Sequence, residues 1–383
     1  MADFSRKEII EKIMNIEKPI NFSGVDFSEI NLEGLDFSKT ILNNTNFKNC
    51  NLNKIDFTEA VLKNIEFYSV KGIPYFKNTS LENIVFKTLE HKSEGEYKFQ
   101  KCKLVNTKFS HPIQFEIEND KPRLEFLNCL IDTAKVATDL ELKVFESELV
   151  HFGIPYQSER KFKLLIDLRK NKIQHCTIAY IEIDNSFSFS LTDNEFYHFQ
   201  ITEIIGATHI YSNKFNDGSF NYLQLTSGNF NHCHFKSVEF SKCELKHTYF
   251  ERHEMFSCIF LCCSFDGLFF RGNEMLRVTL EADFTKCKIH NCTYKDSTLQ
   301  ASSYIDCEFW ETKLYNSSIS KVVFKNTTFK YCKIENTHFI DCTFEDVEID
   351  NSNFIDVTFT NCKGHEKINV STAKKGIIAS FFK

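Results

Sequence analysis

The chain places a large apolar residue at every fifth position over long stretches of its length. From Phe22 to Phe67 each fifth residue is Phe or Leu, and similar runs extend from Phe215 to Leu280 and from Phe284 to Phe359. A period of five fits neither the 3.6-residue repeat of a helix nor the two-residue alternation of a strand. The pattern therefore predicts a chain that turns a corner every five residues and points one large side chain inward on each side.

The position two residues before each large residue is small, and this explains most of the cysteines. Eleven of the 15 cysteines take that position in a clear register: Cys50, Cys102, Cys233, Cys243, Cys258, Cys263, Cys287, Cys292, Cys307, Cys332 and Cys342. Although Cys287 and Cys307 stack closely enough for a disulfide to be considered, we expect small, buried, reduced thiols. Only Cys262 falls at a clearly outward position.

Several repeats carry Asp or Asn directly before the large residue, as in Asn46-Phe47, Asn51-Leu52, Asp56-Phe57 and Asn353-Phe354. In this respect the chain resembles the pentapeptide-repeat family, whose motif is A(D/N)LXX. The resemblance implies an all-β chain folded as a right-handed quadrilateral β-helix, with four pentapeptides in each coil. Residues twenty apart should then stack, as in a ladder of Phe284, Tyr304, Phe324 and Phe344.

The repeat and its breaks suggest five regions. Residues 1–19 are expected to form an N-terminal capping helix, because Ser5 and Glu8 match a capping box and Ile9, Ile10, Ile13 and Ile16 form a stripe. Residues 20–109 and 215–364 are the two β-helix segments, and register slips at 68–75, 87–98 and 280–284 predict bulges or loops at corners. Residues 365–383 form either the opposite cap or a contact for a homodimer through the C-terminus, as the resemblance implies.

Residues 110–214 hold only fragments of the repeat and are expected to be irregular. Within them 136–172 is predicted to be a helical insertion, with helices at Asp139–His151 and Ser158–Arg169. Leu142, Phe145 and Leu149 have helical spacing. Two interpretations remain open: an insertion that packs against the coils, or a projection that binds a partner.

Composition excludes some functions. The 46 basic and 52 acidic residues give a net charge of −6, so direct nucleic-acid binding through a basic stripe is not expected. The sequence contains neither a secretory leader nor an apolar run of about 18 residues, which indicates a cytoplasmic protein without a membrane span. An effector exported without a leader would look the same.

No motif for nucleotide or zinc binding is present, and we expect no cofactor, no metal and no enzyme activity. His232 and His234 point outward while Cys233 points inward, so these three residues do not converge on an ion. The outward positions are not expected to form a pocket, which catalysis requires.

A partner-binding surface is the remaining candidate site. It consists of the single outward tryptophan, its aromatic neighbour and an acidic band: Trp310, Tyr331, Glu345, Asp346, Glu348 and Asp350. Trp310 is either a binding anchor or a side chain lying flat on its neighbours, and the acids are either recognition groups or a solubilising band.

Two functions fit these features. The first is a protein-interaction scaffold or effector. The second is a DNA mimic that binds a type II topoisomerase, as gyrase-inhibiting and quinolone-protecting members of the family do. A duplex mimic should carry acid along its length, and here Lys236, Lys242, Lys246 and Arg252 interrupt it, so the scaffold is favoured.

Overall fold

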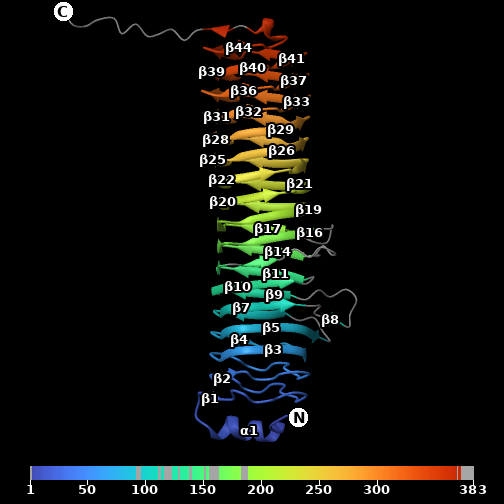
Figure 1. Cartoon of the computed structure of the whole chain (residues 1–383), viewed down its shortest axis with the longest axis vertical. Coiled ribbons are helices and arrows are strands. Elements are labelled where there is room, and N and C mark those ends of the chain that lie inside the picture. The colour runs from blue at the N-terminus through green and yellow to red at the C-terminus, as the bar shows by residue number, and fades with distance from the viewer. Residues whose placement is uncertain are drawn as a thin grey trace, which may run out of the picture. The chain divides into compact units, whose positions relative to one another are not determined.

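The computed structural model is all-β apart from one α-helix and one 3-10 turn among the residues that it describes. These residues are 2–91, 96–110, 114–115, 123–127, 130–137, 140–150, 152–154, 164–182, 189–368 and 370–371. The chain forms two compact units, Met1–Ser219 and Phe220–Lys383, and strand β20 (Lys214–Asn221) crosses their boundary. Within each unit short strands stack as coils (Figure 1).

The first unit contains the helix and the longer strands: α1 (Arg6–Asn15), β1 (Ile20–Asn21), β2 (Thr40–Asn43), β3 (Val61–Lys71), β4 (Phe76–Lys77), β5 (Ser80–His91), β6 (Glu96–Gln100), β7 (Lys103–Ser110), β8 (Gln114–Phe115), β9 (Arg123–Leu127), β10 (Leu130–Ala137), β11 (Leu140–Phe145), β12 (Glu148–Val150), β13 (Gly153–Ile154), β14 (Leu164–Arg169), β15 (Lys172–Gln174), β16 (Thr177–Glu182), β17 (Phe189–Thr192), β18 (Glu195–Tyr197) and β19 (Gln200–Tyr211). The second unit consists mainly of three-residue strands: β21 (Gln224–Asn231), β22 (His234–Ser241), β23 (Glu244–Lys246), β24 (Thr248–Glu251), β25 (Glu254–Phe256), β26 (Ile259–Asp266), β27 (Phe269–Arg271), β28 (Glu274–Leu276), β29 (Thr279–Thr285), β30 (Lys288–His290), β31 (Thr293–Lys295), β32 (Thr298–Gln300), β33 (Ser303–Ile305), β34 (Glu308–Trp310), β35 (Lys313–Tyr315), β36 (Ser318–Ser320), β37 (Val323–Lys325), β38 (Thr328–Lys330), β39 (Lys333–Glu335), β40 (His338–Ile340), β41 (Thr343–Glu345), β42 (Glu348–Asp350), β43 (Asn353–Ile355), β44 (Thr358–Thr360), η1 (His365–Lys367) and β45 (Val370–Ser371).

Four strands make one coil in the second unit. The strands β34, β35, β36 and β37 pair in parallel with β30, β31, β32 and β33, one on each side of the coil. Tyr304 pairs with Phe324, twenty residues later. The four-sided coil that the repeat implied is confirmed, while its right-handed sense stays a prediction.

Large inward side chains form continuous stacks inside the coils. The rings of Phe284 and Tyr304 lie 4.5 Å apart and nearly parallel, and the stack continues to Phe324 at 5.3 Å and Phe344 at 5.2 Å. Phe324 is only 1% exposed. The predicted ladder is therefore confirmed, and its apolar burial is the main favourable term for the fold.

The small inward residues also satisfy the backbone. Thr312 Oγ1 donates to the Ile289 carbonyl at 2.9 Å, and Cys258 Sγ lies 3.4 Å from the Phe235 carbonyl, in each case 23 residues back along the chain. A buried hydroxyl without a partner would be costly, so many of the small donors bond to the preceding coil, and others, such as Ser317, bond to a carbonyl two residues back. This explains why Ser, Thr and Cys share the position.

Residues with positive φ form the corners. Asn316, Lys321 and Tyr331 have φ of 49°, 55° and 55°, a region that costs L-residues roughly 1–2 kcal/mol. Many corner N–H groups donate to a carbonyl of the following coil, as Asn316 does to Glu335 at 3.1 Å. The corner strain is therefore offset by stacking.

The helical insertion predicted at 136–172 is wrong. The described residues of that region form strands, and Leu142 and Val144 of β11 pair with Ile166 and Leu168 of β14, 24 residues later. All four are buried in alternation, which is a strand pattern. The helical spacing of Leu142 and Leu149 arose because they lie on consecutive sides of one coil. Ser158 and its neighbours lie outside the described residues.

Residues 110–214 are therefore not irregular where they are described. Several of their coils are longer than those of the second unit, since Leu104 pairs with Ile131 and Ile173 pairs with Phe196. These longer spacings interrupt the five-residue period in the sequence while the pairing of the described strands is kept.

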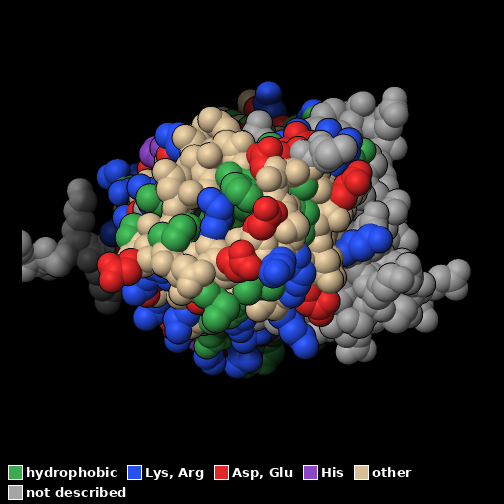
Figure 2. Space-filling view, turned by 90° about the horizontal axis from the view of Figure 1, so that it is seen from below, with side chains coloured by type: hydrophobic (Ala, Val, Ile, Leu, Met, Phe, Trp, Pro, Cys, Tyr) green, Lys and Arg blue, Asp and Glu red, His purple; other side chains and the backbone are tan. Residues whose placement is uncertain are grey.

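The N-terminal helix is confirmed, and it covers the first coils. Ser5 and Glu8 form the capping box, and Ile9 is fully buried. The Arg6 guanidinium donates to the carbonyls of Asn31 and Glu33 in the coils beneath. The predicted stripe extends one turn too far, because Ile16 is 46% exposed. Figure 2 looks onto this end and shows basic, acidic and hydrophobic side chains interspersed.

The register slips coincide with changes in coil length. Phe67 pairs with Phe86 and Leu280 with Leu299, which are nineteen-residue spacings, and Leu81 pairs with Leu104, a 23-residue spacing. In the pairing of β26 with β29 the register shifts between Leu261 and Cys263. Cys262 therefore bulges outward.

At the C-terminus β45 pairs with β43, and residues 372–383 of the predicted cap or dimer contact lie outside the described part.

The thiols provide the first prediction. The 14 described cysteines are free; Cys262 is exposed, Cys362 is half-buried and the others are buried. Burial raises the pKa of Cys292 to about 12 and that of Cys258 to about 11, so buried thiols should be unreactive. We expect native protein to react rapidly with a thiol reagent at Cys262 and denatured protein to titrate close to 15 thiols. A Cys262→Ser variant that keeps the fast phase would contradict this assignment.

A buried histidine sets the second prediction. His253 lies in the small inward column, where its Nδ1 accepts from the Cys233 N–H at 3.1 Å. Desolvation, together with nearby His232 and His234, lowers its pKa to about 3. The unfolded chain has a histidine pKa near 6.5, so between about pH 6.5 and 3 the unfolded state binds the additional proton and stability falls as pH falls.

Replacing His253 with Asn should remove this acid sensitivity. Asn273, in the next coil of the same column, accepts from the His253 N–H and donates to the Phe250 carbonyl, so Asn fits the position. The slope is about 1.4 kcal/mol per pH unit, or roughly 2 kcal/mol between pH 6.5 and 5. Denaturant unfolding of both proteins at pH 8 and pH 5 measures the difference, and equal losses in both would contradict it.

Candidate interaction face

One side of the second unit carries most of the predicted site. Strands β24, β27, β30, β34, β38 and β42 stack in register on this side. The central residue of each strand points inward, as Phe309 does, and the two flanking residues point outward. We call this side the aromatic face.

A line of ring contacts crosses five coils of the aromatic face. Tyr249 meets Phe269 at 6.0 Å, Phe269 meets His290 at 5.2 Å, His290 meets Trp310 at 6.1 Å and Trp310 meets Tyr331 at 5.5 Å. These centroid distances fall within the range of favourable aromatic pairs. The line holds Trp310 in a fixed orientation between His290 and Tyr331.

Trp310 packs on its neighbours and keeps part of its surface exposed, and its role as a binding anchor stays a prediction. Its side chain is 37% exposed, and Tyr331 is 50% exposed. Because the tryptophan is held by rings on two sides, less conformational entropy is lost when a partner covers it.

Charge changes sign along the aromatic face. Lys288 lies in register with Glu308, and Arg271 with His290, at the end nearer Phe269. Beyond Trp310 the column continues through Lys330 to Asp350, with Glu348 beside it on β42. The face is therefore mainly basic before Trp310, where Glu251 is the one acid in register with Arg271, and mainly acidic after it.

The structure brings together only part of the predicted site. Trp310, Glu348 and Asp350 share the aromatic face, and Tyr331 and Asp346 occupy two of its corners. Glu345 lies on the adjacent side, where it forms an ion pair with Lys325 at 2.9 Å. Its charge is therefore partly neutralised.

Two nearer acids were not included in the predicted site. Glu308 belongs to the same strand as Trp310, and Glu311 is the next corner residue, whereas Glu348 and Asp350 lie two coils away. Glu308 also lies 3.7 Å from His290. Strand register shows this proximity, and spacing by twenty residues could have shown it from the sequence.

The acidic band encircles the coils. Glu335 on β39 and Glu345 on β41 lie on two different sides and are both paired with lysines, at 2.7 and 2.9 Å. Glu348 and Asp350 lie on a third side. A band with partly paired charges presents no acidic stripe along the coils, as predicted.

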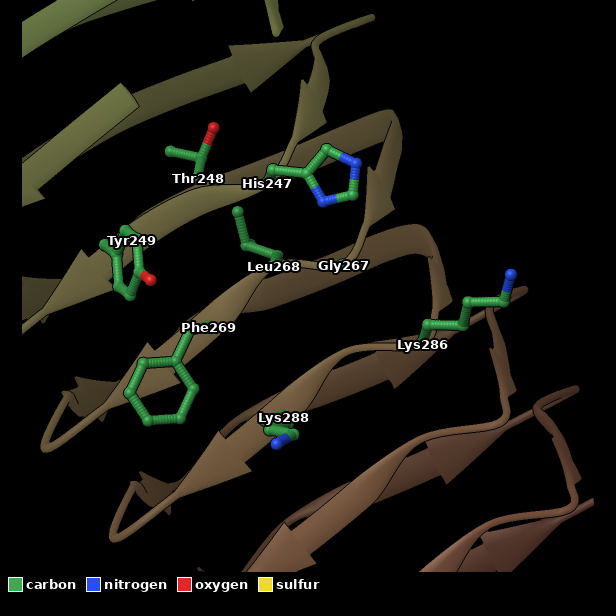
Figure 3. Close-up of a pocket in the computed structure, with 8 residues that line it drawn as sticks. All are labelled: His247, Thr248, Tyr249, Gly267, Leu268, Phe269, Lys286 and Lys288. Carbon is green, nitrogen blue, oxygen red and sulfur yellow. The ribbon is translucent and has the colours of Figure 1, made fainter. Parts of the chain in front are cut away.

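The expectation that no pocket exists is wrong. A cavity of about 350 Å³ opens on the aromatic face, and its lining consists of His247, Thr248, Tyr249, Gly267, Leu268, Phe269, Lys286 and Lys288 (Figure 3). The sequence analysis did not predict this cavity because Phe269 and Lys288 are neighbours only through a nineteen-residue coil, which departs from the regular spacing of twenty.

Within the described part of the chain, no group of three His, Cys, Asp or Glu residues is arranged to hold a metal ion. His234 bonds to Glu254 at 3.0 Å while Cys233 is buried, so these residues point apart as expected. None of the described helices has the length and apolarity to cross a membrane.

Comparison with known proteins identifies the repeat. A model of the pentapeptide repeat region matches residues 280–354, and a model of pentapeptide repeats in eight copies matches residues 20–64. No curated protein matches the sequence.

Solved structures share low similarity with the chain. Full-length QnrB1, a plasmid-mediated fluoroquinolone resistance protein, has 15% identity and a TM-score of 0.30, covering 53% of this chain and 92% of its own. HetL, a pentapeptide repeat protein involved in heterocyst differentiation regulation from the cyanobacterium Nostoc sp. strain PCC 7120, has 9% identity and a TM-score of 0.16, covering 92% and 94%. The PL6 family alginate lyase AlyGC has 6% identity and a TM-score of 0.35, covering 96% and 98%. All three TM-scores are below 0.5. The identification of pentapeptide repeats in this chain therefore depends on the family models and on the coil geometry.

The contact between His290 and Trp310 predicts a pH-dependent fluorescence signal. Desolvation, opposed by Glu308, lowers the pKa of His290. Because a protonated imidazole quenches a neighbouring indole, emission from Trp310 should fall on acidification with a midpoint below about 6.5. A fluorescence titration measures it, and a His290→Asn variant that retained the transition would contradict the assignment.

Proposed function

Because the segments that the family models match are pentapeptide repeats, we propose that this chain is a non-enzymatic scaffold. It would bind a protein partner at the Trp310 end of its aromatic face. The coil interior is filled by stacked side chains, which leaves recognition to outward residues. The observation that carries the proposal is the ring contact between Trp310 and Tyr331 beside Glu308 and Glu311.

The local charge favours a basic partner. A cationic side chain over an indole ring is attracted by the negative ring face, and the attraction increases when solvent is excluded. Glu308 and Glu311 lie next to Trp310, so they can complete the recognition of a Lys or Arg. Glu348 and Asp350, two coils away, would act mainly by steering association.

A reducing compartment is part of the proposal. Disulfides form and persist in oxidising environments, and each of the 14 described cysteines is a free thiol. A cytoplasmic location fits this, and an effector delivered into another cytoplasm fits it equally.

The DNA-mimic alternative depends on the acidic band at 335–356. Two of its seven acids are paired with lysines, which weakens the resemblance to a duplex. In this alternative, purified protein would inhibit gyrase supercoiling or protect it. Neutralising Glu348 and Asp350 would remove that effect, and Trp310→Ala would keep it.

The scaffold proposal predicts that Trp310→Ala weakens the complex with a partner captured from host extract by at least about 2 kcal/mol, mainly through faster dissociation. Replacing Glu348 and Asp350 with Gln and Asn should instead slow association and reduce its salt dependence. Binding kinetics at two salt concentrations measure both effects.

Phe256→Ala is the matched control. Phe256 is 38% exposed, nearly the same as Trp310, but it lies on β25, on the neighbouring side of the coil. If the control weakens binding as much as Trp310→Ala does, or if neither does, the proposed surface is wrong.

A further inference from the structure

The His247 imidazole lies at the edge of the cavity on the aromatic face because the next corner lacks a side chain. The corner residues preceding this face have positive φ and include His247, Gly267, Lys286 and Asp306. A Cβ on Gly267 would lie 2.8 Å from His247 Nδ1, so the imidazole occupies the space that a side chain would need. Figure 3 shows the His247 ring beside Gly267, with Tyr249 and Phe269 beyond Leu268.

Aromatic rings form one wall of the cavity. Tyr249 is 54% exposed, and its ring meets that of Phe269 nearly at right angles, with an interplanar angle of 84°. An exposed and a half-buried ring at this angle can contact a planar ligand by its face and its edge.

Cationic groups form the other part of the lining. Lys286 occupies the corner of the coil after Gly267, and Lys288 lies in register below Phe269. Figure 3 shows Lys288 near the Phe269 ring, whereas the Lys286 side chain extends away from both rings, and the eight lining residues include no Asp or Glu. Such a lining attracts an anion that accepts several hydrogen bonds.

We propose that this cavity binds a ligand that carries both an aromatic ring and a phosphate and has the size of a nucleoside monophosphate. The ring would lie against Tyr249 and Phe269, and the phosphate would accept from Lys288, with His247 and Lys286 at the edge. The volume of about 350 Å³ is at the small end of ligand pockets, which suits one nucleotide. Stacking of a base on an aromatic side chain typically contributes about 1–3 kcal/mol.

A nucleic acid strand does not fit the same site. Along the aromatic face, beyond Lys288, come Glu308, Glu311 and, two coils later, Glu348 and Asp350. A polyanion lying along the coils would be repelled by these carboxylates. The basic part of the face can therefore accommodate a single phosphate group but not a chain of phosphates. This inference does not depend on the scaffold proposal, because it concerns other residues of the face.

Titration calorimetry at low salt tests the proposal. We expect adenosine 5′-monophosphate to bind saturably at one site, and adenosine and inorganic phosphate, which each lack one half of the ligand, to bind at least tenfold more weakly. Phenyl phosphate distinguishes the source of the ring: affinity equal to that of the nucleotide indicates that any aromatic ring with a phosphate is sufficient, and weaker binding indicates a nucleobase. Absence of saturable binding of both compounds, or equal binding of inorganic phosphate, would overturn the proposal.

A pair of glycine variants gives a matched control. Gly267→Asn should displace the His247 imidazole that lines the cavity and reduce affinity at least tenfold, as should Lys288→Gln. Gly272 has nearly the same φ, 62° against 61°, at the other corner of β27, and a Cβ there would be 3.7 Å from the nearest atom. Gly272→Asn should bind as wild type does. With folding verified by circular dichroism, wild-type affinity in Gly267→Asn would overturn the site.

Discussion

The fold depends on the hydrogen bonds that the corners donate to the following coil. Corners with positive φ are unfavourable for the Lys, Glu and Tyr residues that occupy them, and an isolated pentapeptide would not adopt them. The bond from the corner N–H to the next coil, such as that from Tyr331 to Asp350 at 3.0 Å, offsets the cost of positive φ. This bond forms only when coils are stacked. Because one coil cannot exist without its neighbours, the core ladders, the small inward donors and the outward columns all follow from stacking.

The sequence predicted the parts in which every coil has the same length. There, spacing by twenty residues gives the neighbours of each side chain, and the stack around Phe324 and the outward position of Trp310 followed directly. The prediction failed between residues 110 and 214, where spacings of 24 and 27 residues hid the repeat and Leu142 and Leu149 acquired helical spacing by coincidence. Strand alternation in Leu142 and Val144 was the available signal, but it competes with a helical period in so short a segment.

The site was harder to predict because it depends on neighbours in other coils. Register placed Trp310, Glu348 and Asp350 on one side, but moved Glu345 to the next side and paired it with Lys325. The cavity needed a nineteen-residue coil that sets Lys288 below Phe269, and the position of the His247 imidazole at its edge needed a missing side chain at Gly267. Neither condition produces a motif in the sequence, since glycine at a corner is ordinary on its own.

The single-residue shortening absorbed at Cys262 has a consequence for how such a chain can change in length. The register of β26 with β29 shifts only between Leu261 and Cys263, and residues on both sides remain paired. A gain or loss of one residue at a corner is thus confined to one bulge, whereas the same change within a three-residue strand would turn its inward residue toward solvent. Duplication of a whole coil would leave every existing pair intact and add one more rung. Insertions and deletions in the gene should therefore accumulate at corners or in multiples of a coil, and each such event would shift the outward columns relative to one another, creating a new surface on an unchanged core.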